Sequence, residues 1–202
     1  MKHLFSVMIA AVGLTCFQAC NNQSNNQDSV DSAKEMNKDK DTAAAMSSDA
    51  NSSSVSAMPV DKDDANFAVE AANGSMMEIA LAKMANDKAV SQRVKSFAAM
   101  MITDHTQASE NLQKIASAKN ITLPATLGDD AKKDSSDLSK KSGADFDKAY
   151  MNMMLDDHKK DEKKFEKAVT DCKDTDLKNF ASTTLQVVKM HLDSAKAITN
   201  KK

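Results

Sequence analysis

The chain contains 202 residues, of which 4 are Gly, 2 are Pro and none is Trp. So few turn residues and aromatic residues exclude a β-sandwich or a β-barrel, because these folds need many turns. The 27 basic and 29 acidic residues give a net charge of −2, which leaves no basic surface of the kind that binds nucleic acid. The composition therefore favours an all-α protein without a nucleic-acid partner.

Residues 1–20 have the pattern of an export signal. Lys2 and His3 form a short basic start, and an apolar run follows over residues 4–17. This run is too short for a membrane-spanning helix, which needs about 20 residues. It is followed by Ala19-Cys20 and then by polar residues. A small residue before a Cys at this point resembles a bacterial lipoprotein signal, so we expect cleavage before Cys20 and acylation of its thiol.

Two other interpretations of this segment stay open. Cys16 could be the processed cysteine, although cleavage there would cut into the apolar run. Alternatively, the segment is an ordinary secretory signal without lipidation. In the lipoprotein case we expect an exported protein, anchored by its lipid in the periplasm or at the outer membrane. Cys172 would then be a lone thiol without a CxxC neighbour, which predicts no redox role.

Residues 21–60, here called the linker, consist mostly of Asn, Ser, Asp, Lys, Gln and Ala and show no hydrophobic periodicity. Such a segment buries too little apolar surface to offset the entropy that it loses on ordering, so we expect disorder. As a flexible tether the linker would span roughly 35 Å root-mean-square. It would separate a membrane anchor from a folded domain over residues 61–202.

Apolar residues recur at helical spacing throughout this domain, and they predict helices over residues 62–87, 91–119, 144–170 and 175–199. Ser91 is the expected N-cap of the second helix. Short joints make the first two and the last two helices antiparallel hairpins, whereas the connection over residues 120–143 is long enough to cross the bundle and to include a short helix. The predicted fold is an all-α, antiparallel four-helix bundle. The residues expected in its core are Phe67, Ala71, Ile79, Ala82, Ala85, Val94, Phe97, Met101, Leu112, Ile115, Phe146, Tyr150, Met154, Phe165, Val169, Leu177, Phe180, Val187, Leu192 and Ile198.

The two hairpins resemble each other in sequence. Residues 97–105 align with residues 150–158, and both segments carry a Met pair and end in Asp-His. This match aligns the second helix with the third. A single aromatic match, Phe67 with Phe180, aligns the first helix with the fourth. The bundle is therefore expected to consist of two related hairpins.

Each predicted helix places one ionisable residue on its inward face, and these are Glu78, His105, His158 and His191. The four lie at mid-bundle depth, within about two helical turns of each other. A buried carboxylate costs several kcal/mol unless it is paired. Coordination of a transition metal such as Zn, Cu or Fe would pair it. A hydrogen-bond network in which Glu78 accepts from His would also pair it, and the sequence leaves both arrangements open.

Other residues near these positions have weaker signals. Asp104 and Asp157 each precede a His and point about 100° away from it, which suits partners that orient the metal ligands. The absence of a Glu-x-x-His motif excludes the di-iron pattern of ferritins. Residues 159–167 alternate Lys with Asp and Glu, which is typical of a solvated helix face. We find no triad, phosphate loop or Cys–His pair, so we predict no catalytic residue.

Together, these residues resemble the domain of unknown function 4142 family of exported bacterial proteins. The resemblance extends from Asn66 to Ile198, and it implies a ferritin-like bundle and export but no reaction. The chain departs from the family pattern at Ala82, where many members have Gly. The motifs that carry the resemblance are Gly74-x-x-x-Glu78, Val94-Lys95-x-Phe97-Ala98, Asp104-His105, Leu123-Pro124, Phe146-Asp147-x-x-Tyr150, His158, Phe165-Glu166, Leu177-Lys178-x-Phe180-Ala181 and His191-Leu192.

The leading hypothesis is a lipid-anchored protein of the cell envelope that is not an enzyme and binds a transition metal through Glu78, His105, His158 and His191. The alternative is a structural or protein-interaction module of the envelope, whose Glu/His cluster is only a buried hydrogen-bond network. An enzyme ranks last, since no general base has an evident substrate pocket. A protein partner is compatible with either hypothesis, and the sequence does not identify one.

Overall fold

The computed structural model describes residues 27–46 and 60–200 of the chain. These ranges contain no strand and six helices, namely α1 (Ser29–Met46), α2 (Lys62–Lys88), α3 (Gln92–Ala118), α4 (Asp129–Ser139), α5 (Gly143–Asp171) and α6 (Thr175–Thr199). The predicted export signal, with Cys16 and Cys20, lies outside the described residues. None of the helices in the described ranges is long and apolar enough to cross a lipid bilayer.

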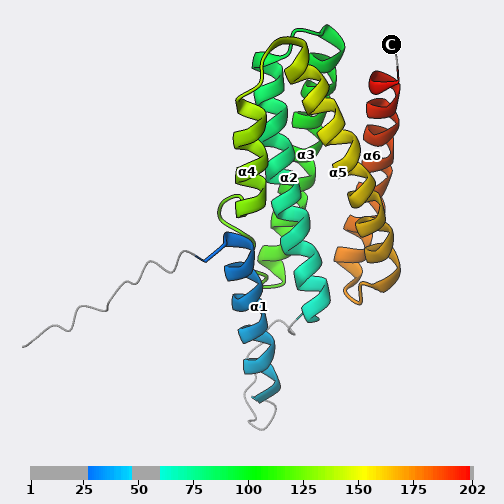
Figure 1. Ribbon diagram of the computed structural model, residues 1–202. Helices are drawn as coiled ribbons and strands as arrows, with labels where there is room; N and C mark the ends of the chain where they lie inside the picture. The colour runs from blue at the N-terminus through cyan, green and yellow to red at the C-terminus, as the bar shows by residue number, and fades with distance from the viewer. Residues whose placement is uncertain (1–26, 47–59, 201–202) are drawn as a thin grey trace, which may run out of the picture.

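The four long helices α2, α3, α5 and α6 form a bundle (Figure 1). α2 packs against α3 and α5, and α6 packs against α5 and α3. α2 and α6 run in one direction and α3 and α5 in the other, so packed neighbours are antiparallel. The single long connection between the second and third helices of the bundle is the ferritin-like arrangement. The predicted fold class is therefore confirmed, and the predicted helix ends agree with the observed ones to within one residue.

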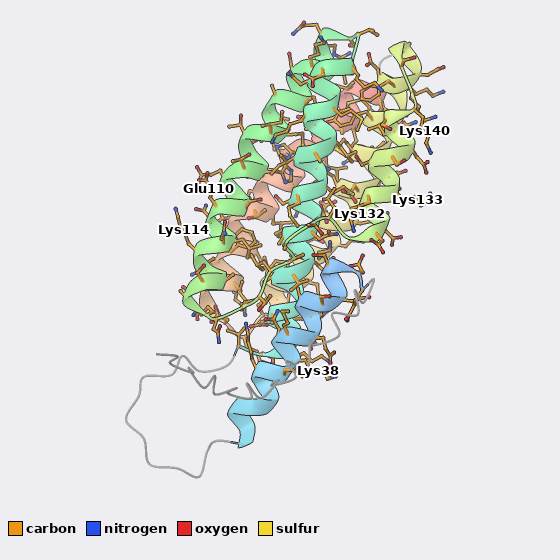
Figure 2. The ribbon with its side chains drawn as sticks, turned by 90° about the vertical axis from the view of Figure 1, so that its left-hand side faces the viewer. Lys38, Glu110, Lys114, Lys132, Lys133 and Lys140 are labelled. Carbon is orange, nitrogen blue, oxygen red and sulfur yellow. The ribbon has the colours of Figure 1, made fainter. Side chains whose placement is uncertain are left out.

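The long connection contains the short helix that the sequence allows for. This helix, α4, runs along α2. It buries Ala131 and Leu138 against the bundle. Its outward face carries Lys132 and Lys133, and the exposed C-cap residue Lys140 follows its last turn (Figure 2). The connection thus returns the chain to the end of the bundle where α5 begins.

A helix also occupies part of the linker, where the sequence predicts disorder. α1 packs against α2 (Figure 1), and Lys34 Nζ lies 2.8 Å from a carboxylate oxygen of Glu70. The Asn37 amide donates to Thr122 O at 2.9 Å and accepts from Thr122 N at 2.7 Å. The prediction of disorder is wrong for α1 because it counts apolar periodicity, whereas polar side chains attach this helix to the bundle.

The bundle core is divided into two apolar clusters along its axis. One, the Phe67 cluster, joins the rings of Phe67, Phe165 and Phe180, whose centroids lie 5.3–6.3 Å apart. The other, the Phe146 cluster, includes Phe146 stacked on Tyr150 at 6.3 Å. The polar residues predicted for mid-bundle depth lie between these two clusters.

Five of the predicted core residues are only half-buried, namely Ile79, Ile115, Val169, Val187 and Ile198. On α6 the core position belongs to Val188, which is 1% exposed, rather than to its neighbour. Spacing by four or seven residues finds the apolar face of a helix but does not separate its centre from its edges.

Two aspartates join the ends of the hairpins. Asp64, at the start of α2, accepts a hydrogen bond from the backbone N–H of Asp174 at the α5–α6 joint, at 2.6 Å. Asp147, near the start of α5, accepts one from the backbone N–H of Ser91 at the α2–α3 joint, at 2.7 Å. Ser91 is the N-cap residue of α3, as predicted, but its own side chain makes no capping hydrogen bond.

These reciprocal contacts correct the predicted alignment of the hairpins. Three pairs of residues have the same separation in the sequence, namely Asp64 and Asp147, Ser91 and Asp174, and Phe97 and Phe180. The equivalent helices are therefore α2 with α5 and α3 with α6. The predicted match of α3 with α5 is therefore wrong as an alignment of the two hairpins. It rests on an Asp-His pair that occurs on both helices, whereas the residues at the joints align α2 with α5 and α3 with α6.

Candidate metal centre

The four residues predicted to share the middle of the bundle do meet there. Glu78 of α2 is 1% exposed, His105 of α3 is 5% exposed, and His158 of α5 and His191 of α6 are fully buried. Each reaches the centre because it lies on the apolar stripe of its own helix. The result is one polar layer between the Phe67 cluster and the Phe146 cluster.

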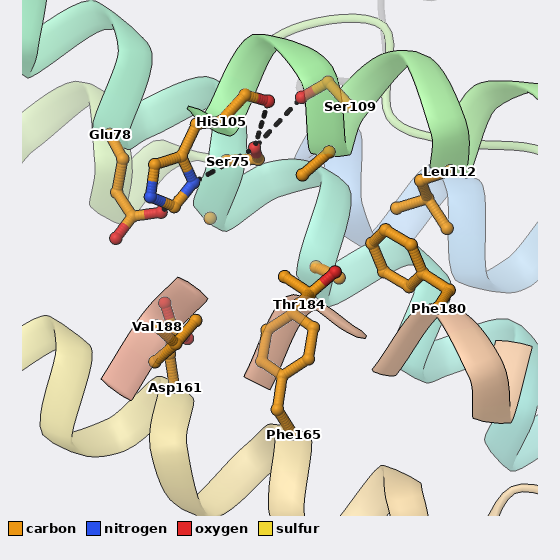
Figure 3. Close-up of a pocket in the computed structure, with 13 residues that line it drawn as sticks. Ser75, Glu78, His105, Ser109, Leu112, Asp161, Phe165, Phe180, Thr184 and Val188 are labelled. Atoms are coloured by element: carbon orange, nitrogen blue, oxygen red, sulfur yellow. Dashed lines mark hydrogen bonds and ion pairs between the residues drawn. The ribbon is translucent and has the colours of Figure 1, made fainter. Parts of the chain in front are cut away.

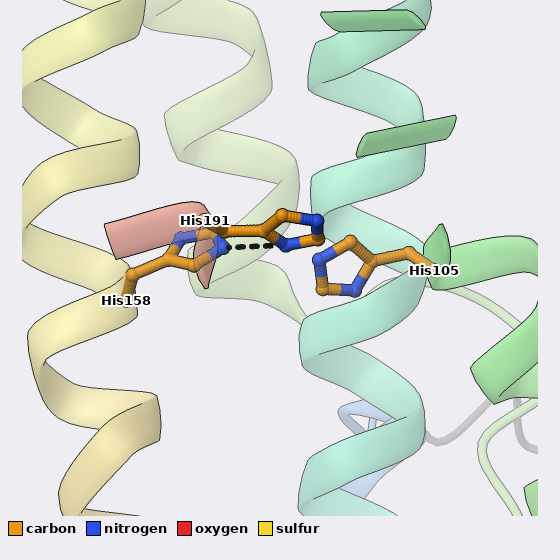
Figure 4. A group of neighbouring side chains, drawn as sticks. All are labelled: His105, His158 and His191. Atoms are coloured by element: carbon orange, nitrogen blue, oxygen red, sulfur yellow. Dashed lines mark hydrogen bonds between the residues drawn. The ribbon is translucent and has the colours of Figure 1, made fainter. Parts of the chain in front are cut away.

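His158 and His191 direct one ring nitrogen each toward the other (Figure 4). His158 Nδ1 lies 2.9 Å from Met154 O, a carbonyl that can only accept, so we assign the ring proton to Nδ1. His191 Nε2 lies 2.9 Å from Asp104 Oδ2, which assigns its ring proton to Nε2. The remaining nitrogens, His158 Nε2 and His191 Nδ1, face each other at 3.4 Å.

His105 completes the group. Its Nδ1 lies 3.0 Å from Glu78 Oε2, so we assign the ring proton to Nδ1. Its Nε2 is buried and has no hydrogen-bond partner among the described residues. The His105 ring centroid lies 5.2 Å from that of His191 and 5.8 Å from that of His158. One nitrogen from each of the three rings lies within 4.8 Å of the other two.

The imidazoles are neutral near neutral pH. Burial lowers the pKa of His105 to about 4. Burial also lowers the pKa of His158, against the opposing effect of the Glu78 carboxylate. It lowers the pKa of His191 as well, against the opposing effect of the hydrogen bond that His191 donates to Asp104. Each ring therefore has one N–H held by an acceptor and one nitrogen lone pair, which is the arrangement of metal-bound histidines.

Glu78 lies on the protonated side of His105, away from the three lone pairs. Its Oε1 is 3.3 Å from His158 Nδ1, but that N–H already donates to Met154 O, and Oε1 receives no hydrogen bond from a described residue. Burial raises the pKa of the Glu78 carboxyl above its usual range. The Glu78 carboxylate thus meets the N–H of His105, while the lone pairs that meet belong to the three histidines.

The two aspartates predicted as orienting partners have different surroundings. Asp104 of α3 reaches across to His191 of α6, as described above. Asp157 makes no hydrogen bond or ion pair with the three imidazoles. It lies in a group of carboxylates with Glu78 and Asp161, in which one oxygen of each lies within 4.8 Å of the others. Sequence reasoning missed Asp161, which the hairpin correspondence places at the position on α5 that Glu78 holds on α2.

A small cavity of about 20 Å³ separates the site from the Phe67 cluster (Figure 3). Its polar lining includes Ser75, Ser109, Thr184, Glu78 and Asp161. Ser75 Oγ donates to His105 O at 3.1 Å and accepts from Ser109 Oγ at 2.9 Å. A cavity of this size has room for about one water molecule.

Cys172 takes no part in this centre. It is the C-cap residue of α5 and is buried. Burial raises the pKa of its thiol to about 12. A thiol that stays protonated at neutral pH is a poor nucleophile and a poor metal ligand.

Fold and site define a ferritin-like helical bundle with a buried histidine centre. The sequence pattern of the family described as "Domain of unknown function (DUF4142)" matches residues 48–198. The chain belongs to this family. No curated protein matches the chain.

The fold is similar to that of a solved structure, a crystal structure of a DUF305 fragment from Deinococcus radiodurans. The TM-score is 0.64 at 8% sequence identity, and the similarity covers 71% of this chain and 99% of that chain. At so low an identity the likeness supports the fold of the bundle alone.

Proposed function

We propose that this DUF4142 protein binds a transition metal ion between His105, His158 and His191. One observation carries the proposal: His158 Nε2 and His191 Nδ1 face each other at 3.4 Å with no proton assigned between them. Two nitrogen ligands at 2.0–2.1 Å from one ion and at the tetrahedral angle lie about 3.4 Å apart. The spacing of the two lone pairs is that of two ligands of one ion.

The energetics favour an ion at this place. A buried nitrogen without a hydrogen-bond partner, such as His105 Nε2, costs about 1–3 kcal/mol. Two neighbouring lone pairs that face each other add repulsion between two fully buried side chains. A cation would convert all three into bonds. Imidazole nitrogens suit Zn, Cu, Fe and Ni, and Zn is the natural first probe because it accepts three His ligands and a fourth group in tetrahedral geometry.

The rival function is a buried hydrogen-bond network in a structural or interaction module. Glu78 Oε2 lies 3.0 Å from His105 Nδ1, which supports this network. A hydrogen bond that also joined His158 to His191 would require a proton between their facing nitrogens, and hence an imidazolium in the core. The contact of Asp104 with His191 at 2.9 Å favours such an ion pair. The desolvation of both rings opposes it, because burial lowers both pKa values.

Metal analysis separates the two functions. The mature protein, purified without a His tag, should hold one ion per chain after incubation with Zn, Cu or Fe and removal of the excess. A free metal concentration of 100 times the Kd stabilises the folded state by about 2.7 kcal/mol, which raises the Tm by roughly 5–10 °C. His191→Gln should lose the ion and the shift. A chain that takes up none of the three metals and shows no change in Tm would leave the network as the function.

We also propose that the protein is exported and anchored by a lipid on Cys20. The support is sequence-based: an apolar run, then a small residue and a Cys. The contacts of α1 change the expected tether, because α1 packs on the bundle from Ser29 onward. The segment between Cys20 and α1 reaches at most about 30 Å when fully extended. The bundle would therefore lie close to the membrane.

Fractionation tests the anchor. The wild-type protein should sediment with membranes and carry the mass of acyl chains at its N-terminus. Cys20→Ser should move it to the soluble fraction, and Cys16→Ser serves as the matched control. A protein that stays in the membrane fraction after Cys20→Ser is not anchored through that residue.

A further inference from the structure

Three carboxylates converge beside the histidine centre. Glu78 comes from α2, and Asp157 and Asp161 come from successive turns of α5, so that one oxygen of each lies within 4.8 Å of the others. Asp157 and Asp161 are four residues apart and share a helix face. The hairpin correspondence brings Glu78 and Asp161 to equivalent depths on α2 and α5.

The positive charge in contact with these three carboxylates is too small to balance their negative charge. Lys164 Nζ lies 3.1 Å from Asp161 Oδ1. Within the described ranges, Glu78 Oε1 and Asp157 Oδ2 are buried and receive no hydrogen bond. When ionised, three carboxylates and one ammonium leave a net negative charge that one divalent cation would neutralise, in a region where an unpaired charge costs a great deal.

A second observation also indicates a cation at this place, and it does not depend on how many acidic groups converge there. Glu78 is 1% exposed, and its Oε1, which receives no hydrogen bond from the described part of the chain, belongs to the carboxylate that lines the cavity together with Asp161 (Figure 3). The hydroxyls of Ser75, Ser109 and Thr184 line the same space. With room for about one water, the cavity can supply a further oxygen ligand beside the carboxylates.

We propose that Glu78, Asp157 and Asp161 form a second cation site, specific for a hard divalent cation such as Mn²⁺. Carboxylate and water oxygens suit Mg, Ca and Mn, whereas imidazole suits the softer transition metals. Glu78 links the two sites, with Oε1 available to the hard cation and Oε2 on the N–H of His105 at 3.0 Å. The site binds its cation whether or not an ion occupies the histidines.

Electron paramagnetic resonance of Mn²⁺ tests this site. The mature protein is titrated with Mn²⁺ in two forms, one stripped with chelator and one saturated with Zn²⁺. In both forms we expect the signal of free Mn²⁺ to fall until one equivalent is bound. Asp157→Asn and Asp161→Asn, which keep the side-chain shape, should each weaken Mn²⁺ binding by roughly tenfold or more and leave Zn²⁺ binding intact.

Three further variants make the test decisive. Asp156→Asn changes the exposed neighbour of Asp157 and should leave the Mn²⁺ titration unchanged. His191→Gln should abolish Zn²⁺ binding and keep Mn²⁺ binding, so this proposal and that of the histidine site can fail separately. Lys164→Gln removes the competing ammonium and should tighten Mn²⁺ binding several-fold, which gives a readout even if an Asp variant does not fold.

Several results would overturn the second site. The first is the absence of bound Mn²⁺ in both forms. Another is Mn²⁺ binding that is lost in His191→Gln but survives in Asp161→Asn, because the ion would then occupy the histidines. Equal losses in Asp156→Asn and Asp157→Asn would show only a general effect of surface charge.

Discussion

The two hairpins, α2–α3 and α5–α6, are alike at their ends and different in the middle. At the ends, Asp64 and Asp147 make the same contact, each accepting from the backbone at the joint of the opposite hairpin. Phe97 and Phe180 occupy equivalent positions after those joints. This repetition places four helices in register around one core. The structural framework therefore depends on what the hairpins share.

The polar centre depends on what the hairpins do not share. None of the three histidines has a histidine at its equivalent position, and the pairs are His158 with Ser75, His105 with Val188 and His191 with Ala108. The carboxylates differ less, since Glu78 corresponds to Asp161. A repeated framework thus carries one asymmetric set of imidazoles, and substitutions that restore the repeat should remove the proposed metal site and leave the bundle.

The largest effect is expected from His158→Ser, which gives α5 the residue that α2 carries at the equivalent position. It removes the lone pair that lies 3.4 Å from His191 Nδ1. We expect the affinity for Zn²⁺ to fall by roughly a thousandfold, or about 4 kcal/mol, in isothermal titration calorimetry. Circular dichroism should show a folded bundle. Zn²⁺ binding at wild-type affinity would mean that the ion lies elsewhere.

The second prediction removes the contact between an aspartate and the backbone of the opposite joint, which both hairpins make. Asp64 is 2% exposed, and its carboxylate accepts from the backbone N–H groups of Lys173 and Asp174 at 2.9 and 2.6 Å. Asp64→Ala leaves these donors without their partner and should lower the free energy of unfolding in urea by about 3 kcal/mol. Asp63→Ala, at an exposed neighbour, should change it by less than about 0.5 kcal/mol. A loss of similar size in both variants would contradict the joint contact.

Particular residues show how far the sequence predicts this molecule. Helix ends are predicted to within one residue because an apolar stripe repeats over about seven turns, and Glu78 stands out because an ionisable residue on such a stripe is rare. Asp161 is not predicted, because it lies in a run of alternating charges that is typical of a solvated face, yet it is 6% exposed. Its burial depends on the depth at which α2 and α5 meet. That depth is a tertiary property which the pattern along one helix does not contain.

The third prediction concerns pH and the pair His105 and Val188. The folded state keeps His105 neutral, because burial lowers its pKa from 6.5 to about 4. Between these values the unfolded state binds more protons than the folded state, so stability falls on acidification. From pH 7 to pH 5 the metal-free wild type should lose about 2 kcal/mol more than His105→Val. Urea unfolding in chelator at both pH values measures the difference, and equal losses would mean that His105 titrates normally.

The smallest effect is expected at α1, which packs on α2 and so distinguishes the two hairpins on their outer surfaces. Asn37 is 8% exposed, and its amide forms both hydrogen bonds with the Thr122 backbone. Asn37→Ala should weaken the attachment of α1 by about 1 kcal/mol, which corresponds to roughly fivefold faster amide hydrogen exchange within Ser29–Met46. Exchange in α5 and α6 and the affinity for Zn²⁺ should not change, and Asp39→Ala is the exposed control. If Asn37→Ala leaves exchange in α1 unchanged, the helix is held by contacts other than this amide, and the salt bridge from Lys34 to Glu70 becomes the next to remove.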